Sequence, residues 1–196
     1  MLNMEVLPLG AYQTNCYLVW EDGSESCAVI DPGFDAQTVL LATRKLGKRM
    51  EAILLTHGHF DHVGAVKEIA GDTDCRVYLC IQDLTMPAQL TAGTLYYTDP
   101  YGEGDEITVA GVTFRVMHTP GHTPGSVCLL AGEHLFSGDT LFAGSCGRTD
   151  LPGGSWETIR GSLRRLAQLE KDWIVHPGHG ESTTLNNERM YNPYMR

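Results

Sequence analysis

The chain has 196 residues, of which 42% are hydrophobic and 19% are charged, and its formal net charge is −10. This length suits one domain over residues 1–196, and no apolar run reaches the ~18 residues that a membrane-spanning helix needs. The net negative charge disfavours binding to nucleic acid and to anionic lipid, because phosphate recognition depends on Lys and Arg. We therefore expect a globular protein with a small-molecule substrate and with neither a nucleic-acid nor a membrane partner.

The first residues, Met1 to Val6, lack the basic region, the apolar segment and the small-residue cleavage site of a signal peptide. We therefore expect a cytoplasmic protein. Its six cysteines include no Cys-x-x-Cys pair, and reduced thiols that pack as small apolar groups are the expectation in that compartment.

Short apolar runs separated by turn residues predict the elements of the first half of the chain. These are strands at residues 4–9, 16–20, 27–30, 52–56 and 76–80 and helices at residues 35–47 and 63–69. Asp35 is a suitable N-cap of the first helix, and Gly47 a suitable stop. Residues 82–104 are irregular and rich in Tyr, Pro and Gly, which is typical of either a surface excursion or a substrate lid.

The second half of the chain repeats this alternation of strands and helices. The predicted elements are strands at residues 106–109, 112–117, 127–131, 134–137 and 173–175, a helix at residues 155–170 and a helix that begins near residue 184. Two runs of strands, each accompanied by helices, predict an α/β protein in which two sheets pack face to face with helices outside. No low-complexity segment divides the two halves.

A dense set of metal-binding side chains follows the apolar run 52–55. It reads His57-x-His59-x-Asp61-His62 and so places three imidazoles and a carboxylate at the end of a predicted strand. Imidazole nitrogen and carboxylate oxygen suit zinc or iron. The motif predicts half of a site for two metal ions.

Candidates for the other half lie in three later segments. His122 and His179 lie in loops rich in Gly and Pro, and Asp139 ends an apolar strand, where a charge without a partner is unusual. The three remaining histidines are expected to pack rather than to bind metal: His118, His134 and His176.

In order and local context these motifs resemble those of the metallo-β-lactamase fold superfamily over essentially the whole chain. The resemblance implies a four-layer αβ/βα sandwich with two mixed sheets and two divalent metal ions, for which zinc is the expected metal and iron or manganese an alternative. It implies that His57, His59 and His122 hold one ion, that Asp61, His62 and His179 hold the second, and that Asp139 bridges them. Asp31 would orient a ligand imidazole, although capping a turn is an alternative role.

Within that superfamily the chain is similar to the short glyoxalase II-like branch, which resembles hydroxyacylglutathione hydrolases. The similar segments are residues 14–19, 29–33, 147–150 and 177–185. The resemblance implies that Asp61 and Asp139 are catalytic residues and that a hydroxide bound between the two metals attacks a thioester such as S-lactoylglutathione. A thiolate leaves without a separate general acid. Longer glyoxalase II enzymes have a C-terminal glutathione-binding helical domain, which is not expected here, so the thiol carrier stays open.

Other activities share parts of this pattern. Persulfide dioxygenases, which use a single iron, are similar over Cys146–Asp150, but they follow the last histidine with Asp-Tyr, whereas Gly180-Glu181 stands here. Lactone hydrolases share the ligand set, and β-lactam cleavage is not expected, because Asp139 stands where the large zinc subclass has Cys. Arg148 is interpreted as a structural ion pair or a substrate contact; the other substrate-binding residues and the oligomeric state are not predicted.

Overall fold

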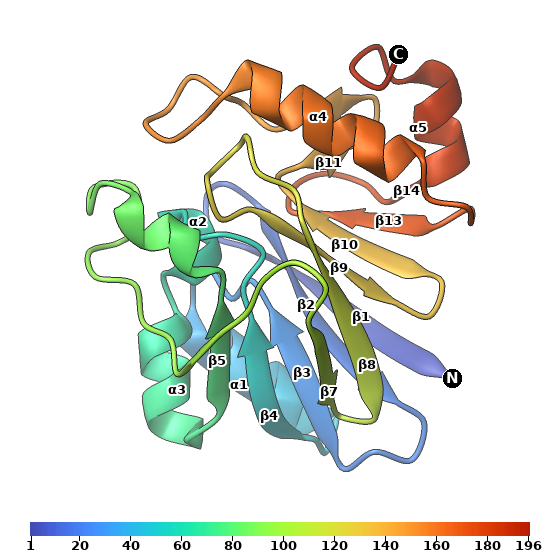
Figure 1. The fold of residues 1–196 in the computed structure, drawn as a ribbon. Helices are drawn as coiled ribbons and strands as arrows, with labels where there is room; N and C mark the ends of the chain where they lie inside the picture. Colours follow the sequence, from blue (N-terminus) through green and yellow to red (C-terminus); the bar gives the residue numbers. More distant parts are fainter.

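Two six-stranded sheets lie face to face in the computed structural model, which describes residues 1–196 (Figure 1). The N-terminal sheet has the order β1-β2-β3-β4-β5-β6 and the C-terminal sheet the order β14-β13-β10-β9-β8-β7. The strands of the N-terminal sheet are β1 (Leu2–Leu9), β2 (Thr14–Glu21), β3 (Ser26–Ile30), β4 (Arg49–Leu54), β5 (Arg76–Leu79) and β6 (Asp99–Pro100). Those of the C-terminal sheet are β7 (Glu106–Val109), β8 (Val112–His118), β9 (Val127–Ala131), β10 (His134–Gly138), β13 (Ile174–Pro177) and β14 (Thr183–Thr184).

The remaining elements are helices and one small hairpin. The helices are α1 (Ala36–Lys45), α2 (Phe60–Val63), α3 (Val66–Thr73), the 3₁₀ helix η1 (Ile81–Thr85), α4 (Trp156–Ala167) and α5 (Leu185–Tyr191), and the hairpin pairs β11 (Leu141–Phe142) with β12 (Ser145–Cys146). Asp35 caps α1 by accepting a hydrogen bond from the Thr38 backbone N–H, and Ser155 caps α4 in the same way through Thr158. No helix is long and apolar enough to cross a membrane.

Both sheets are mixed. In the N-terminal sheet β1, β2 and β3 are antiparallel, and β3 to β6 run parallel. The parallel strands require crossovers, which α1 and α3 supply. In the C-terminal sheet only β10 and β13 are parallel, and α4 lies in the connection between them. These crossovers bring the carboxyl ends of β4, β10 and β13 to one edge of the sandwich, where their loops meet.

Three apolar layers account for the four-layer architecture. The outer layer on the N-terminal side packs Val39 of α1 and Ile69 of α3 against one face of the sheet. The central layer joins the two sheets, with Ile30 and Leu54 on one side and Phe136 on the other. The outer layer on the C-terminal side packs α4 and α5 against that sheet through these buried residues: Leu130, Leu135, Val175, Ile159, Leu163, Leu166 and Leu185.

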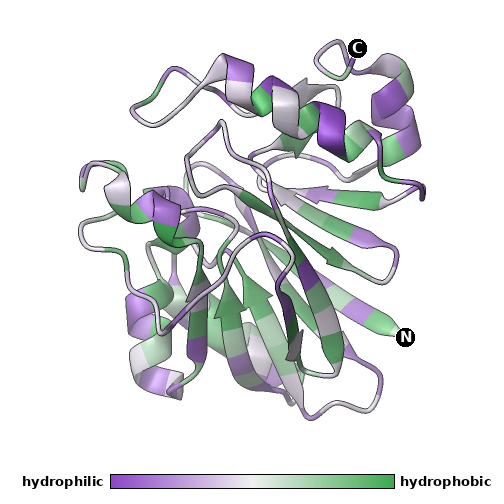
Figure 2. Ribbon diagram, viewed as in Figure 1, coloured by the Kyte–Doolittle hydropathy of each residue, from purple (hydrophilic) through white to green (hydrophobic).

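Alternation along the strands explains how one sheet serves two layers. In β3, Cys27 and Val29 face the outer layer, whereas Ala28 and Ile30 face the central layer. Because both faces are covered, the strand is apolar at nearly every position. Figure 2 shows the same pattern, since green predominates along the central strands while α4 alternates green and purple along its length.

The expected fold is therefore confirmed, with differences in detail. The predicted helix over 155–170 ends at Ala167, and the strand predicted at 52–56 ends at Leu54 so that residues 55–59 form a loop. The irregular segment 82–104, predicted as a surface excursion or a substrate lid, contains short regular elements. It begins in η1 and includes β6, which adds a sixth strand to the N-terminal sheet through pairs with β5.

One buried histidine pair predicts a pH dependence of stability. His176 is buried; its Nε2 lies 2.9 Å from His134 Nδ1, and its Nδ1 lies 3.1 Å from Ser182 Oγ. Burial and then the neighbouring His134 lower the pKa of His176 to about 4. As the pH falls below the ordinary histidine pKa of about 6.5, the unfolded chain binds a proton that the folded chain does not, so stability is lost between pH 6.5 and pH 4.

Between pH 7 and pH 5 the free energy of unfolding should fall by roughly 2 kcal/mol less in His176→Gln than in the wild-type chain. The measurement is urea unfolding of both proteins at the two pH values. The quantity compared is the difference between pH values, because the substitution also changes two hydrogen bonds at every pH. Parallel stability curves for the two proteins would contradict this assignment.

Candidate metal centre

Four loops at one edge of the sandwich carry the histidine and aspartate side chains. His57, His59 and His62 follow β4, with His62 in the short helix α2. His122 follows β8, Asp139 follows β10 and His179 follows β13. Strand ends are positions where loops of a rigid scaffold converge.

Three imidazoles form a first cluster. His59 Nδ1 lies 2.8 Å from His122 Nε2, and the ring centroid of His57 is 4.9 Å from that of His59 and 4.8 Å from that of His122. The three side chains each offer a ring nitrogen within 4.8 Å of the others, and all three are buried. Three imidazole nitrogens in this arrangement are a common set of protein ligands for zinc.

Two imidazoles and a carboxylate form a second cluster. His179 Nε2 lies 3.2 Å from Asp61 Oδ2 and 3.4 Å from His62 Nε2, and His62 Nε2 lies 3.7 Å from Asp61 Oδ2. Asp61 and His179 are partly exposed, whereas His62 is completely buried. This cluster is therefore open to solvent on one side.

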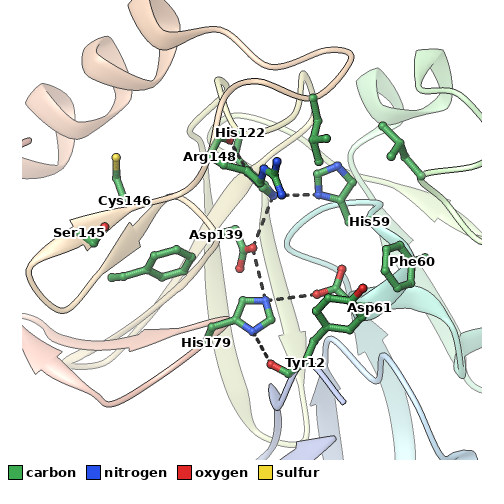
Figure 3. Close-up of a pocket in the computed structure, with 13 residues that line it drawn as sticks. Tyr12, His59, Phe60, Asp61, His122, Asp139, Ser145, Cys146, Arg148 and His179 are labelled. Carbon is green, nitrogen blue, oxygen red and sulfur yellow. Dashed lines mark hydrogen bonds and ion pairs between the residues drawn. The ribbon is translucent and has the colours of Figure 1, made fainter. Parts of the chain in front are cut away.

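Asp139 lies between the two clusters (Figure 3). Its Oδ2 is 3.5 Å from His122 Nε2 and also 3.5 Å from His179 Nε2, and its Oδ1 is 3.3 Å from His62 Nε2. One carboxylate thus contacts a member of the first cluster and two members of the second. A negative group in this position offsets the repulsion between two cations.

The outer nitrogens of three imidazoles have hydrogen-bond partners. His62 Nδ1 lies 2.9 Å from Asp31 Oδ2, His122 Nδ1 lies 2.8 Å from the Arg148 carbonyl oxygen, and His179 Nδ1 lies 3.1 Å from the Tyr12 carbonyl oxygen. A proton on each outer nitrogen leaves the inner nitrogen free to act as a ligand. Asp31 is itself held by the backbone N–H and hydroxyl of Thr56, at 2.8 and 2.5 Å.

Asp31 therefore lies beside the outer nitrogen of a ligand imidazole, as the family resemblance implies. We expect Asp31→Asn to weaken metal binding by about 10–100-fold. An amide presents either an oxygen or an NH₂ group to His62 Nδ1, so the ring loses its charged partner. Binding is measured by competition with a chromogenic chelator. Asp35→Asn is the matched control, because Asp35 is an exposed N-cap that Asn also satisfies. Equal affinities in the two variants would contradict a role for Asp31 in orienting His62.

The protonation states of His57, His59 and Asp139 suit metal binding. Burial and then the neighbouring His62 and His122 hold the pKa of His57 well below its usual range, and burial lowers the pKa of His59 to about 4. Burial alone would raise the pKa of Asp139, but His62 and His179 hold it well below its usual range. Near neutral pH these groups are neutral imidazoles and an ionised carboxylate. Despite burial, Asp139 and Asp31 raise the pKa of His62, so a cation that binds there displaces a proton.

Polar atoms without partners show that the cluster fits metal ions. His57 Nδ1 lies 3.2 Å from Thr56 Oγ1, but its Nε2 is buried without a hydrogen-bond partner, and the same holds for Asp139 Oδ1. His59 presents Nδ1 to His122, and its Nε2 also has no partner. Buried polar atoms are rarely left unsatisfied, and cations between the inner nitrogens and the carboxylate would satisfy the first two.

Glycines let the backbone approach the cluster closely. A Cβ at Gly178 would lie 2.2 Å from Asp139 Oδ1 and 2.7 Å from His62 Cε1. A Cβ at Gly147 would lie 1.8 Å from the Asp139 carbonyl oxygen. The loops around the cluster therefore require glycine at both positions.

A cavity of about 540 Å³ opens onto both clusters. Its lining includes Asp61, Asp139, His59, His122 and His179, and its remaining walls are largely apolar. The apolar lining residues are Tyr12, Phe60, Leu90, Phe142 and Leu151. Figure 3 shows Tyr12 and Phe60 beside Asp61. Their rings are in edge-to-face contact, with 5.4 Å between the ring centroids.

Arg148 is the cationic side chain of the cavity lining. Its guanidinium donates to both carboxylate oxygens of Asp150 at 2.7 Å, and its pKa is raised by that pair. The pair is exposed, so it adds little stability. The structure thus shows the ion pair, and the substrate contact stays a prediction. Cys146 also lines the cavity, whereas Cys16 lies in the outer apolar layer.

Six of the seven predicted ligand residues thus lie in two adjoining clusters, and the seventh, Asp139, lies between them. The other histidines do not: His118 Nε2 lies 2.8 Å from the Pro124 carbonyl oxygen, and His134 pairs with His176. Sequence reasoning missed Asp83, which is buried against two of the loops, because it lies in the irregular segment and no motif surrounds it. It also assigned no role to Asn15, which holds the loop of His179.

Comparisons with known proteins agree with this site. The family model described as the metallo-beta-lactamase superfamily matches residues 9–179. The chain is 36% identical to the hydroxyacylglutathione hydrolase GloC of Haemophilus influenzae, over 99% of this chain and 98% of that protein. It is 34% identical to the probable metallo-hydrolase YqgX of Bacillus subtilis, over 96% of this chain and 95% of that protein.

Solved structures show the same architecture. The crystal structure of TTHA1623 in a di-iron-bound form has a TM-score of 0.86 and 39% identity, over 97% of this chain and 99% of that one. BLEG-1, a B3 metallo-beta-lactamase, has a TM-score of 0.88 and 35% identity, over 100% of this chain and 99% of that one. The buried histidine and aspartate clusters are consistent with a site for two metal ions. The chain belongs to the metallo-beta-lactamase superfamily, as a metallo-hydrolase whose candidate centre is these two clusters.

Proposed function

We propose that the protein is a hydrolase of thioesters, of the hydroxyacyl-thiol kind that S-lactoylglutathione represents, and that it works with two divalent cations, zinc by preference. The observation that carries the proposal is the position of Asp139 between two complete ligand clusters at the floor of the cavity. Similarity to the hydroxyacylglutathione hydrolase GloC supports the substrate class. The di-iron form of TTHA1623 supports two cations and makes iron the alternative metal.

The proposed centre assigns a role to each metal ligand and to its hydrogen-bond partners. His57, His59 and His122 would hold one cation, Asp61, His62 and His179 the other, and Asp139 both. Such a pair of cations supplies Lewis acidity and lowers the pKa of water toward neutrality. Asp31 and the carbonyl oxygens of Arg148 and Tyr12 keep the outer imidazole nitrogens protonated, as described above.

The cavity walls support a thioester rather than a more polar ester or amide. Phe60, Leu90 and Phe142 form an apolar wall beside the clusters, which would provide a surface for the acyl group and the sulfur. A thiol has an ordinary pKa of about 8.5, so the thiolate departs without a proton donor. The chain accordingly needs no general acid, and the lining outside the clusters contains no carboxyl group or imidazole that would serve as one.

A single-iron oxygenase that acts on persulfides is the second candidate. The structure of ETHE1 from Myxococcus xanthus has a TM-score of 0.85 and 27% identity, over 97% of this chain and 83% of that one. The segment Cys146–Asp150, which resembles persulfide dioxygenases, includes Arg148, and this residue lines the same cavity. The second cluster of Asp61, His62 and His179 favours the hydrolase, because one cation would leave that cluster without a function.

The test is an assay of purified chain loaded with zinc or iron, combined with elemental analysis. S-lactoylglutathione should release thiol, detected with a disulfide reagent, and a chelator should abolish the release until metal is restored. Glutathione persulfide should cause no oxygen uptake, and a chromogenic β-lactam should not be opened. Oxygen uptake without thiol release would overturn the hydrolase and favour the oxygenase. Cleavage of the β-lactam faster than that of S-lactoylglutathione would overturn the thioester as the substrate.

A further inference from the structure

Two groups of buried hydrogen bonds lie just outside the metal centre and contact different loops. One group is centred on Asp83 and the other on residues 12–17, which comprise the end of the turn between β1 and β2 and the start of β2 and are called the turn segment. Neither contributes a metal ligand. The first cluster, His57, His59 and His122, is called the first half-site, and the second cluster, Asp61, His62 and His179, the second half-site.

Asp83 joins the two loops that carry the first half-site. It is completely buried, and its Oδ2 accepts hydrogen bonds from the Gly58 backbone N–H at 2.7 Å and from Thr123 Oγ1 at 3.0 Å. Its Oδ1 accepts from the Gly125 backbone N–H at 2.6 Å. Gly58 separates His57 from His59, and Thr123 follows His122 directly. One carboxylate therefore fixes the distance between the loops of all three imidazoles.

The packing around Asp83 leaves little freedom. A Cβ at Gly125 would lie 2.8 Å from Asp83 Cγ, and a Cβ at Gly58 would lie 3.3 Å from Asp83 Cβ. The two glycines let both backbone amides reach the carboxylate. An asparagine has the same shape, but its NH₂ group would have to face one of these N–H donors, and one loop would lose its contact.

The turn segment makes a separate set of contacts to the second half-site. Asn15 Nδ2 donates to the Pro177 carbonyl oxygen at 3.0 Å and to the Gly180 carbonyl oxygen at 2.9 Å, so it spans His179 on both sides. The Asn15 backbone N–H donates to the Gly178 carbonyl oxygen at 2.7 Å.

Three further hydrogen bonds complete this set. Tyr17 Oη donates to the Pro177 carbonyl oxygen at 2.7 Å, and the Tyr12 carbonyl oxygen accepts from His179. Thr14 Oγ1 donates to Asp61 Oδ2 at 3.2 Å. The turn segment thus contacts two of the three ligands of the second half-site directly, and it makes no hydrogen bond to a ligand of the first.

We propose that the two metal half-sites are held by separate braces, Asp83 for the first and Asn15 with its turn for the second, so that each metal can be weakened without the other. The proposal rests on the proposed two-cation centre. Both are positioning residues, because neither touches a cation or a substrate. Loss of a partner that orients metal ligands typically weakens metal binding by about 10–100-fold.

The experiment compares each brace variant in two backgrounds that retain one half-site. His179→Ala leaves the first half-site and His122→Ala leaves the second. The affinity for zinc ions is measured by competition with a chromogenic chelator. Asp83→Asn should weaken zinc binding by about 10–100-fold in the His179→Ala background and by less than about threefold in the His122→Ala background. Asn15→Ala should show the reverse.

Matched controls separate bracing from charge and from general destabilisation. Asp74→Asn removes the same charge from an exposed position, and Asn186→Ala makes the same truncation at an exposed position of α5. Both should leave either affinity unchanged. If circular dichroism shows that a brace variant does not fold, a milder substitution replaces it. Thr123→Val deletes one hydroxyl hydrogen bond of the Asp83 brace and should weaken zinc binding in the same background as Asp83→Asn. Tyr17→Phe deletes one hydroxyl hydrogen bond of the second brace and should behave like Asn15→Ala.

The outcomes separate this proposal from the proposed function. A wild-type chain that binds two zinc ions, with brace variants that weaken both backgrounds equally or neither, overturns the separate braces and leaves the two-cation hydrolase standing. A wild-type chain that binds fewer than two zinc ions overturns the two-cation centre, and the braces with it. Thioester hydrolysis by the wild type is recorded in parallel and decides the activity independently.

Discussion

Asp139→Ala is expected to reduce thioester hydrolysis at least roughly 1,000-fold and to lower the metal content from two ions per chain to one or fewer. The side chain contacts His122 and His179 through Oδ2 and His62 through Oδ1, so its removal takes a shared ligand from both clusters. It also removes the negative charge that offsets the repulsion between two cations. The measurements are elemental analysis of the dialysed protein and kcat/KM for S-lactoylglutathione.

Asp139→Asn distinguishes charge from shape at this position. The amide keeps the size of the carboxylate, but it has one good ligand atom and no negative charge. We expect it to bind a single ion and to have activity close to that of Asp139→Ala. Two tightly bound ions in either variant would contradict the position of Asp139 as a shared ligand.

Gly178→Ala is expected to cause the second largest loss, although it adds only one methyl group. That group would lie 2.2 Å from Asp139 Oδ1 and 2.7 Å from His62 Cε1, closer than atoms in contact allow, so the loop of His179 or the Asp139 side chain must move. Shifts of this size misplace catalytic groups, and we expect kcat/KM to fall about 100-fold. Zinc stoichiometry should fall with it, because His179 belongs to the displaced loop.

Gly71→Ala is the matched control for this substitution. Gly71 lies in α3, where a Cβ would meet nothing within 4 Å. Alanine there should leave metal content and activity unchanged and should raise stability by up to about 1 kcal/mol, since alanine favours the helix. Normal zinc content in Gly178→Ala would show that the loop adapts and that close approach at Gly178 is not required.

The local pattern of the sequence was sufficient for most of the architecture. Strands with apolar residues on both faces, such as Cys27–Ile30, and caps such as Asp35 and Ser155 are encoded by neighbouring residues. The strand β6 was not predicted, because its two residues pair with β5 only through tertiary contact. The small hairpin of β11 and β12 escaped prediction for the same reason, since two-residue strands carry no periodicity.

The amino-acid sequence indicated the candidate metal ligands, because the spacing His57-x-His59-x-Asp61-His62 and the Gly-rich loops of His122 and His179 are local patterns. The family resemblance also implied that Asp139 lies between two metal sites and that Asp31 orients a ligand imidazole. The distances among these groups, and the contacts of Asp83 and Asn15 with loops 25 to 165 residues away in the chain, came from the folded structure. The contacts of Asp83 and Asn15 depend on the packing of the two sheets, and no short motif encodes them.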